Sequence, residues 1–431
     1  MDDRIKRLEK ENQRLRRALE ELSILNEIAT AIGSTLTLDQ IVDLMVQKCV
    51  KHFNVEQAAV MMLNRGRSED PFQTIIRRAD TSSEILPYRL NAQLTGWMLK
   101  HQKPLMINDL RTDERFEGFV DENLPIRSLL SVPLMAKGKI IGLINAFNKK
   151  SPEGFDINDQ RLLAIIATQS AQVLENARLL EEEQALLRMK EEIRTAHDIQ
   201  VNLMPKAPPK FAGNEYDIAG TSIPAKTVGG DYYDFIKMSD NRLAFGLGDV
   251  TGKGLPAALL MANVQATIRS QTLLANSAKD CMKNANKLMF ESTTPGKFVT
   301  MFYGILDTQN HTLSYCNAGH DAPYLYIPGN STQQLETGGT VLGFVPEYNY
   351  SEAITPFDPG SRLVLYSDGI TEAMNAENEE FGEQRLQDVI AQNHQATSFE
   401  LLEAVINSVK QHAGNTPQSD DVTLVIITRK L

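Results

Sequence analysis

Aspartates recur beside apolar, β-rich runs in the second half of this 431-residue chain. Asp231 lies in VGGDYYDFI, Asp249 in LAFGLGDVTGKG, Asp368 in SRLVLYSDGITEA, and Asp420 with Asp421 in PQSDDVTLVIITRK. Strands that bring several carboxylates to one rim form an oxygen-rich site, which suits Mg²⁺ or Mn²⁺ rather than zinc. Two such ions can activate a water and hold a phosphoryl group.

Each aspartate also has a simpler interpretation, because Asp-Gly pairs commonly mark turns. Four such positions at strand boundaries in one half of the chain, two of them within glycine clusters, favour a metal site. Glycine beside a ligand lets the backbone approach closely.

The glycine-rich stretch GLGDVTGKGLPAA, residues 246–258, is not a nucleotide-binding loop. A phosphate-binding loop needs a glycine where Leu247 stands and a Ser or Thr where Gly254 stands. The dinucleotide pattern fails as well, because Thr251 occupies the place of its third glycine. Asp249 is therefore the residue of interest in this stretch.

Composition limits the class of protein. A net charge of −11 argues against bulk nucleic-acid binding. The three cysteines are far apart and match neither a disulfide framework nor a zinc site, which fits a reducing cytoplasm. With no apolar run of membrane-spanning length and a charged N-terminus, we expect a soluble, cytoplasmic protein of two or three domains.

The first 28 residues follow a heptad pattern and predict a coiled-coil dimerisation helix. The shared stripe comprises Ile5, Leu8, Asn12, Leu15, Leu19, Leu22 and Asn26. Leucine at d-like positions with Asn12 at an a-like position favours a parallel homodimer. Basic residues at 14, 16 and 17 alternate with glutamates, which is typical of a solvated helix face rather than a DNA-binding region.

Residues 29–175 alternate helix and strand signals, including a hairpin that turns at Lys137-Gly138. The stretches SLLSVPLMAKGKIIGLINAFNK and FDINDQRLLAIIATQSAQVLENA resemble a GAF domain, an α+β sensor module. The resemblance implies a small-molecule ligand or a regulatory protein as its partner. Four residues echo a motif of cyclic-nucleotide-binding GAF domains, but Gln160 replaces its glutamate, so we expect turn-and-cap roles for Asn148, Lys149, Phe155 and Asp159.

Residues 176–205 predict a helical signalling linker. The helix that begins near residue 157 continues to Pro205, where the residue before proline leaves the helical region. Val173, Ala177, Leu180 and Leu187 share an apolar stripe, although a passive spacer is the alternative.

Residues 206–431 contain six motifs in a fixed order, namely PAKTVGGDYYDF, GDVTGKGLPAALLMA, FVTMFYGILD, YCNAGHDAPYL, LVLYSDGITEAMN and SDDVTLVIITRK. This order resembles the SpoIIE/RsbU-like branch of the metal-dependent (PPM-type) serine/threonine phosphatases, and AHDIQVNLMP resembles the helix that opens its catalytic domain. The resemblance implies an αββα sandwich with two Mn²⁺ or Mg²⁺ ions at one edge. The whole chain is then of the α+β class.

The resemblance also implies a set of site residues. It makes Asp231, Asp249, Asp368 and Asp420 catalytic metal ligands, with Asp249 bridging both ions and the Val250 carbonyl as a backbone ligand. Supporting positions are Gly230, Gly369 and Asp421, so Asp420 is favoured over its neighbour as the ligand. Lys226 falls where related enzymes bind phosphate, although an ordinary surface lysine is equally compatible with the sequence.

One departure concerns the general acid. Many eukaryotic relatives have a histidine two residues after the bridging aspartate, where this chain has Thr251. His320 in NAGHDAP is a candidate replacement, but a histidine in such a turn more often caps or orients the loop. His197, on the opening helix, fits a structural or switch role better than a ligand role.

The implied function is hydrolysis of a phosphoserine on an anti-sigma-factor antagonist by hydroxide attack, under control of the sensor through the linker. Alternatives are a metal-dependent phosphodiesterase and a non-catalytic sensor scaffold. A transcription regulator that uses the basic N-terminal helix is a third, against which the net charge argues.

Overall fold

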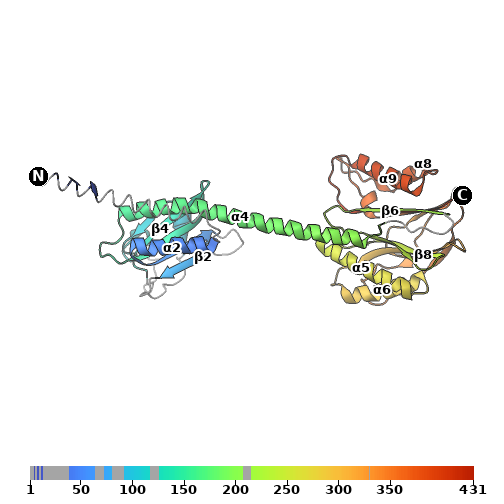
Figure 1. Ribbon diagram of the computed structural model, residues 1–431, viewed down its shortest axis with the longest axis horizontal. Helices are drawn as coiled ribbons and strands as arrows, with labels where there is room; N and C mark the ends of the chain where they lie inside the picture. Colours follow the sequence, from blue (N-terminus) through green and yellow to red (C-terminus); the bar gives the residue numbers. More distant parts are fainter. Residues whose placement is uncertain are drawn as a thin grey trace. The chain divides into compact units, whose positions relative to one another are not determined.

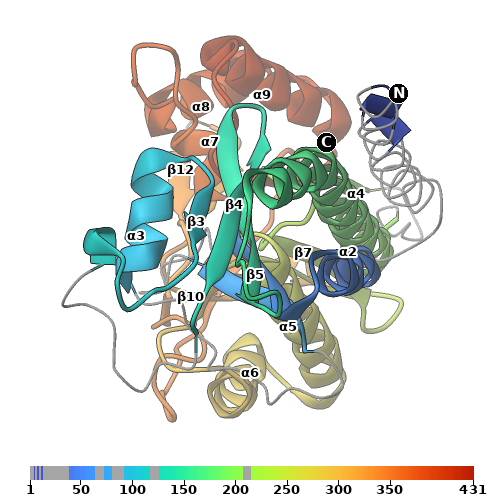
Figure 2. The same ribbon diagram turned by 90° about the vertical axis from the view of Figure 1, so that its left-hand side faces the viewer.

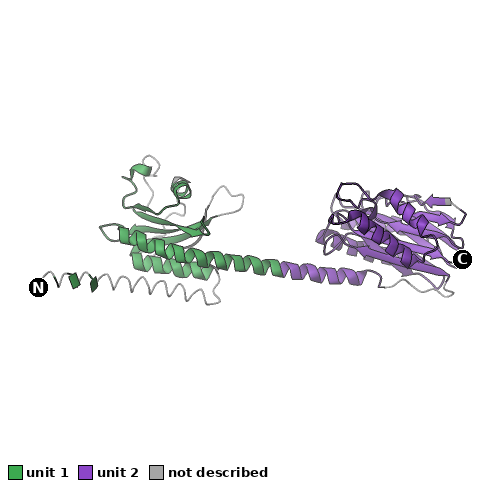
Figure 3. Ribbon diagram, turned by 90° about the horizontal axis from the view of Figure 1, so that it is seen from above, with its two compact units in different colours: residues 1–187 green, residues 188–431 purple. Residues whose placement is uncertain are grey.

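The computed structural model describes residues 4, 7–8, 11–12, 38–63, 72–79, 92–116, 126–206, 215–329 and 331–431. The chain divides into two compact units, residues 1–187 and 188–431, which Figure 3 colours separately. The predicted dimerisation helix, residues 1–28, lies almost entirely outside the described residues.

The first unit contains an antiparallel sheet in the order β2-β1-β5-β4-β3. Its strands are β1 (Val55–Leu63), β2 (Phe72–Ala79), β3 (Leu105–Ile107), β4 (Leu129–Ala136) and β5 (Lys139–Lys149). The predicted hairpin is confirmed: Lys137 and Gly138 join β4 to β5 with φ values of 50° and 74°. Positive φ at both central residues is what a tight hairpin turn of this kind requires.

Helices cover both faces of this sheet. α2 (Leu38–Phe53) and the first part of α4 (Ile157–Leu203) pack against one face through a shared apolar core. α3 (Ala92–His101) and the short 3-10 helix η1 (Glu114–Phe116) contribute to a second core on the other face. Figure 2 shows α3 and α4 on opposite sides of β4 and β5.

The helix α4 is continuous over 47 residues and ends two residues before Pro205, as the sequence indicated. The last helix of the first unit and the predicted linker are therefore one element. The expected domain boundary at residues 175–176 falls inside that helix. None of the described helices is both long and apolar enough to cross a membrane.

The second unit contains two sheets, with strand orders β13-β10-β9-β8-β7, to which β14 adds beside β10, and β12-β11-β15-β16-β6. The strands are β6 (Tyr216–Ile223), β7 (Tyr232–Lys237), β8 (Arg242–Val250), β9 (Val299–Asp307), β10 (Thr312–Ala318), β11 (Tyr324–Ile327), β12 (Ser331–Gln334), β13 (Gly338–Gly339), β14 (Ala353–Pro356), β15 (Arg362–Tyr366) and β16 (Val422–Arg429). We refer to them as the β8 sheet and the β16 sheet.

The alternation of side chains along each strand makes these sheets a sandwich. Leu247 of β8 and Val425 of β16 belong to a common core between the sheets. Their alternate neighbours contact helices instead: α5 (Leu255–Leu274) and α6 (Ala278–Ser292) cover the β8 sheet, and α8 (Gly382–Gln392) and α9 (Ser398–Ala413) cover the β16 sheet. Figure 1 shows the resulting four layers, which confirm the expected αββα arrangement.

Candidate active site

Two of the predicted ligands come from the β8 sheet. Asp231 directly precedes β7, and Asp249 is the last residue but one of β8. Tyr233 and Leu247, two residues away from them along their strands, lie in the core between the sheets. Because side chains two apart share a face, both carboxylates project toward the inter-sheet space at this edge.

The β16 sheet supplies the other acidic residues. Asp368 opens the short helix α7 (Asp368–Thr371) after β15, and Asp420 and Asp421 precede β16. β15 and β16 are antiparallel neighbours, so the end of one lies beside the start of the other. Gly369 packs so closely against the backbone of residues 420–421 that no Cβ would fit there. The structure therefore brings these predicted residues together.

Asp421 joins the loop of Asp231 to the opposite sheet. Its carboxylate accepts hydrogen bonds from the backbone N–H groups of Ala225 (2.8 Å), Gly230 (2.5 Å) and Asp231 (3.3 Å). A Cβ on Gly230 would lie 3.2 Å from the Val250 carbonyl oxygen, so this glycine permits the close approach of the loop to β8. These contacts fit the supporting roles expected for Gly230 and Asp421.

The carboxylates at this edge repel one another. Burial, and then the charge of Asp249, raises the pKa of Asp231 well above its usual range. Burial raises the pKa of Asp249 to about 7, with further contributions from Asp368 and Asp420. The pKa of Asp368 is also raised, by burial and then by Asp420. A cation placed among these groups would offset both the cost of burying the carboxylates and the repulsion between them.

The donor set fits hard divalent cations. Asp231 Oδ2 is buried and has no hydrogen-bond partner among the described residues, which leaves a lone pair free for an ion. In the described part of the chain, no three or more His, Cys, Asp or Glu side chains form a compact ligand group. Carboxylate and carbonyl oxygens are the ligands that Mg²⁺ and Mn²⁺ prefer, and Mg²⁺ usually keeps several waters.

Two lysines flank the acidic edge. Lys253 Nζ lies 2.7 Å from the Asp420 carboxylate and donates a hydrogen bond of 2.8 Å to the Ser419 carbonyl. The hydrogen bond with Asp420 raises the pKa of Lys253. Lys226, the predicted phosphate ligand, is exposed, and its Cδ lies 4.0 Å from where a Cβ on Gly254 would be. Both cations therefore border the loop that follows Asp249.

The histidines have structural contacts. His320 contacts the Thr300 hydroxyl through Nδ1 (2.9 Å) and the Tyr366 carbonyl through Nε2 (3.2 Å). Burial lowers its pKa to about 4, so the ring is neutral near pH 7 and does not suit a general acid. His197 Nδ1 lies 2.6 Å from the Thr227 carbonyl oxygen. These contacts are compatible with the loop-orienting role expected for His320 and the structural or switch role expected for His197.

Sequence reasoning missed two residues of this region. Gln200 on α4 donates a hydrogen bond to the Gly229 carbonyl (2.7 Å) and accepts one from its N–H (3.0 Å). Burial and the nearby Asp368 raise the pKa of Asp321 to about 6. The sequence places both residues in quoted motifs, AHDIQVNLMP and YCNAGHDAPYL, but nothing in their type or spacing distinguishes them from neighbours.

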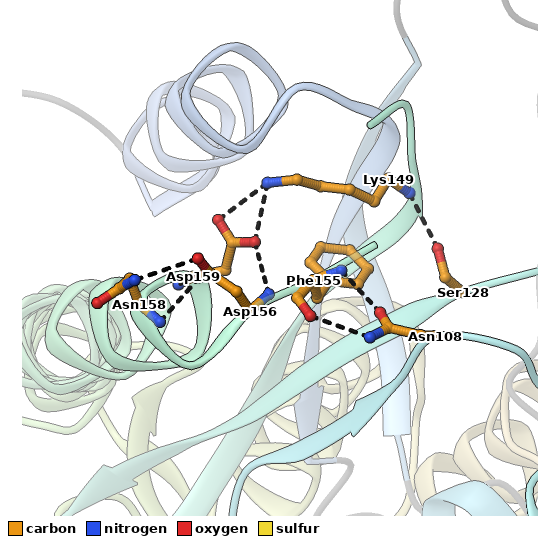
Figure 4. A network of polar contacts seen from close by, with 7 residues as sticks. All are labelled: Asn108, Ser128, Lys149, Phe155, Asp156, Asn158 and Asp159. Carbon is orange, nitrogen blue, oxygen red and sulfur yellow. Dashed lines mark hydrogen bonds and ion pairs between the residues drawn. The ribbon is translucent and has the colours of Figure 1, made fainter. Parts of the chain in front are cut away.

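The motif residues of the first unit form hydrogen bonds and an ion pair with nearby groups; Figure 4 shows those of Lys149, Phe155 and Asp159. Lys149 Nζ lies 2.9 Å from both carboxylate oxygens of Asp159 and 5.6 Å from the centroid of the Phe155 ring. Asn108 exchanges two hydrogen bonds with the Phe155 backbone, of 3.0 and 2.7 Å. Asn148 Oδ1 accepts from the Arg127 N–H at 2.7 Å. This network supports the turn-and-cap roles.

Comparison with known proteins identifies the second unit. A model of the family "Stage II sporulation protein E (SpoIIE)" matches residues 239–430, and a GAF domain model matches residues 35–175. The chain is 31% identical over 245 residues to the phosphoserine phosphatase RsbU of Bacillus subtilis (strain 168), covering 56% of this chain and 71% of RsbU. The chain belongs to the SpoIIE/RsbU family of PP2C-type phosphatases. It is a protein serine/threonine phosphatase with an N-terminal GAF domain.

Two further proteins match over similar shares of this chain. Protein IcfG of Synechocystis sp. is 27% identical over 265 residues, covering 55% of this chain and 41% of IcfG. The SiaA-PP2C domain of Pseudomonas aeruginosa is 20% identical and covers 57% of this chain and 98% of that domain, with a TM-score of 0.49. The SpoIIE match begins at residue 239 and so includes Asp249, Asp368 and Asp420 but not Asp231.

Proposed function

We propose that this SpoIIE/RsbU-type phosphatase hydrolyses a phosphoserine on a regulatory protein of the anti-sigma-factor-antagonist type, with two Mn²⁺ or Mg²⁺ ions as cofactors. The observation that carries the metal assignment is the buried, unpartnered Asp231 Oδ2 beside Asp249. The similarity to the phosphoserine phosphatase RsbU supports the substrate class.

Both sheets would supply ligands for the cations. Asp231, Asp249 and the Val250 carbonyl approach from the β8 sheet, and Asp368 and Asp420 approach from the β16 sheet. Asp249 fits the bridging role because its carboxyl interacts with both Asp368 and Asp420. When bound, such ions supply an activated water as nucleophile and neutralise phosphoryl oxygens. Asp421 keeps the Asp231 loop in place while the substrate binds.

The lysines would recognise the dianionic phosphate group. Lys226 and Lys253 place positive charge beside the carboxylates, which steers a phosphoserine toward the edge. Cysteine does not suit a nucleophilic role, because Cys49, Cys281 and Cys316 are all buried. Burial raises the pKa of Cys281, the one on α6, to about 11.

Regulation would act through α4. The first part of this helix packs in the core of the GAF domain, and its last turns bond to the loop that precedes Asp231. Binding of a small molecule or a regulatory protein at the GAF domain would thus change how firmly that loop is held. Exposed leucines on α4, such as Leu180 and Leu187, together with residues 1–28, support a homodimer.

The substrate class is tested by comparing monoester and diester hydrolysis in the full-length protein. We expect Mn²⁺-dependent phosphate release from a phosphoserine protein and no comparable cleavage of bis(p-nitrophenyl) phosphate. Preferential cleavage of the diester would instead support a phosphodiesterase. Absence of both Mn²⁺ binding and hydrolysis would support a non-catalytic sensor scaffold.

A further inference from the structure

We propose that His320 is a positioning residue that ties the two sheets together at the metal-binding edge. It would thereby set the spacing between Asp249 on the β8 sheet and Asp368 on the β16 sheet. The inference rests on the proposed metal centre, because it concerns how the chain holds the ligands of that centre in place.

The two partners of His320 lie next to these aspartates. Thr300, the second residue of β9, is the register partner of Asp249 on β8. Its side chain shares a face with Phe302, which belongs to the core between the sheets. On the other sheet, Tyr366 ends β15 two residues before Asp368. His320 itself lies between β10 and β11 and belongs to neither pair of strands.

The imidazole ring spans the gap with both of its nitrogens. The Tyr366 carbonyl can only accept, so Nε2 carries the hydrogen and donates over 3.2 Å. In the neutral ring Nδ1 is then an acceptor, and the Thr300 hydroxyl donates to it over 2.9 Å. One side chain therefore completes a hydrogen-bonded link from the β8 sheet to the β16 sheet.

The turn that carries His320 is itself fixed. Asn317 accepts a hydrogen bond from the His320 N–H (2.8 Å) and donates to its carbonyl (2.9 Å) and to the Leu335 carbonyl (3.2 Å). Gly319 has a φ of 72°, a left-handed conformation that glycine adopts readily. The side chain of His320 is only 8% exposed. The backbone that carries the ring is therefore held in place, and so are the two groups that the ring contacts.

Loss of this link should affect cation binding more than folding of either sheet. Each sheet keeps its own aspartates and its own helices, and Asp421 still joins the Asp231 loop to the β16 sheet. The link between the strand beside Asp249 and the strand before Asp368 is lost. Residues that position metal ligands without binding the metal themselves commonly contribute about 10-fold to 100-fold to metal affinity. Because its ring contacts protein groups on both sides, His320 acts through the ligands rather than on the substrate.

The test is Mn²⁺ titration calorimetry on the full-length protein, with His320→Gln, Thr300→Val and the double variant. Glutamine keeps an N–H donor for the Tyr366 carbonyl, so both single changes cut the contact between Thr300 and His320. Thr300→Val also removes a 3.5 Å hydrogen bond from the Thr300 hydroxyl to the Asp249 carbonyl, and the double variant shows whether the two residues act together. We expect each to weaken Mn²⁺ binding by at least about 10-fold, and the double variant to be no weaker than the weaker single one. His311→Gln is the matched control, because His311 also bonds a hydroxyl, that of Tyr216 (2.9 Å), and should bind Mn²⁺ as the wild type does.

The possible failures are distinguishable. Unchanged Mn²⁺ affinity in Thr300→Val would overturn the inference, and this near-isosteric change keeps the test valid should His320→Gln fold poorly. Additive losses in the double variant would also overturn it, because the two residues would then act separately. Absence of Mn²⁺ binding in the wild-type protein would instead refute the proposed function on which the inference rests.

Discussion

Gln200 and Gly229 form a two-point clasp: the buried amide of Gln200 donates to the Gly229 carbonyl and accepts from its N–H. Gly229 stands two residues before Asp231, so the last turn of α4 holds the loop that delivers a predicted metal ligand. The carboxylate of Asp421 holds the same loop from the other side, through the N–H groups of residues 225, 230 and 231. The position of Asp231 thus depends on both α4 and the β16 sheet.

Replacement of Gln200 by alanine should therefore lower the turnover number for a phosphoserine substrate by between about 10-fold and 100-fold. The loop would lose both hydrogen bonds, and a small misplacement of a ligand is costly to catalysis. Steady-state kinetics on the full-length protein checks this. Gln184→Ala, an exposed position on the same helix, is the control and should keep wild-type kinetics. Equal turnover in both variants would argue against a role for the clasp.

Arg269→Ala should lower the free energy of unfolding by about 2–3 kcal/mol. Asp234 is buried, and Arg269 donates two hydrogen bonds to its carboxylate, of 2.6 and 3.1 Å. The change leaves a buried charge without its ion-pair partner, contacted only by neutral donors, the Tyr232 hydroxyl and the Phe235 N–H. Urea denaturation measures the loss of stability. Lys283→Ala, an exposed position on α6, should change stability little. An equally small change in the free energy of unfolding for Arg269→Ala would show that the ion pair between Arg269 and Asp234 contributes little to stability.

The sequence predicted the fold well where hydrophobic alternation and turn chemistry agree. The hairpin at Lys137-Gly138 and the strands beside each aspartate follow directly from such patterns. The arrangement of layers came from the family resemblance, because local patterns do not encode which sheet packs on which. The sequence also predicted one helix from near residue 157 to Pro205, and α4 is that helix, so the expected boundary between sensor and linker at residues 175–176 lies within it.

The sequence singled out residues that carry their chemistry in their type and missed residues that act through long-range contacts. An aspartate between a strand and a glycine is recognisable, whereas Gln200 resembles any helical glutamine until Gly229 is placed beside it. His320 was recognisable as an orienting residue, but its two partners, Thr300 and Tyr366, are 20 and 46 residues away in the chain. Only the packed sandwich brings them together.

The stability of the protein should depend on pH through His320. The pKa of this buried ring is about 4 in the folded protein against an ordinary value of 6.5, so between these values the unfolded chain binds more protons. Its contribution to the free energy of unfolding is therefore lost as the pH falls from 6.5 to 4, by up to about 3 kcal/mol. Denaturation of wild type and His320→Gln across this range, in metal-free buffer, isolates the effect. A difference between the two that does not vary with pH would contradict the buried, neutral ring.

Lys226→Ala should raise KM for a phosphoserine substrate several-fold and change the turnover number less. The lysine lies beside the loop that follows Asp249 and would contribute attraction for the phosphate group in ground and transition states alike. The effect should shrink at high salt, since the side chain is exposed. Lys283→Ala serves again as the control. A KM equal to that of wild type would leave Lys226 as an ordinary surface residue.

Metal-dependent phosphatase activity is tested most directly by phosphate release from a phosphoserine protein, with and without Mn²⁺, by wild type and Asp249→Asn. Asp249 is the carboxylate whose charge interacts with both Asp368 and Asp420, so its substitution should disable both cation positions together. We predict release that requires Mn²⁺ in the wild-type protein and falls by at least about 1,000-fold in the variant. Release that is independent of added and bound metal, or that persists in Asp249→Asn, would contradict the account.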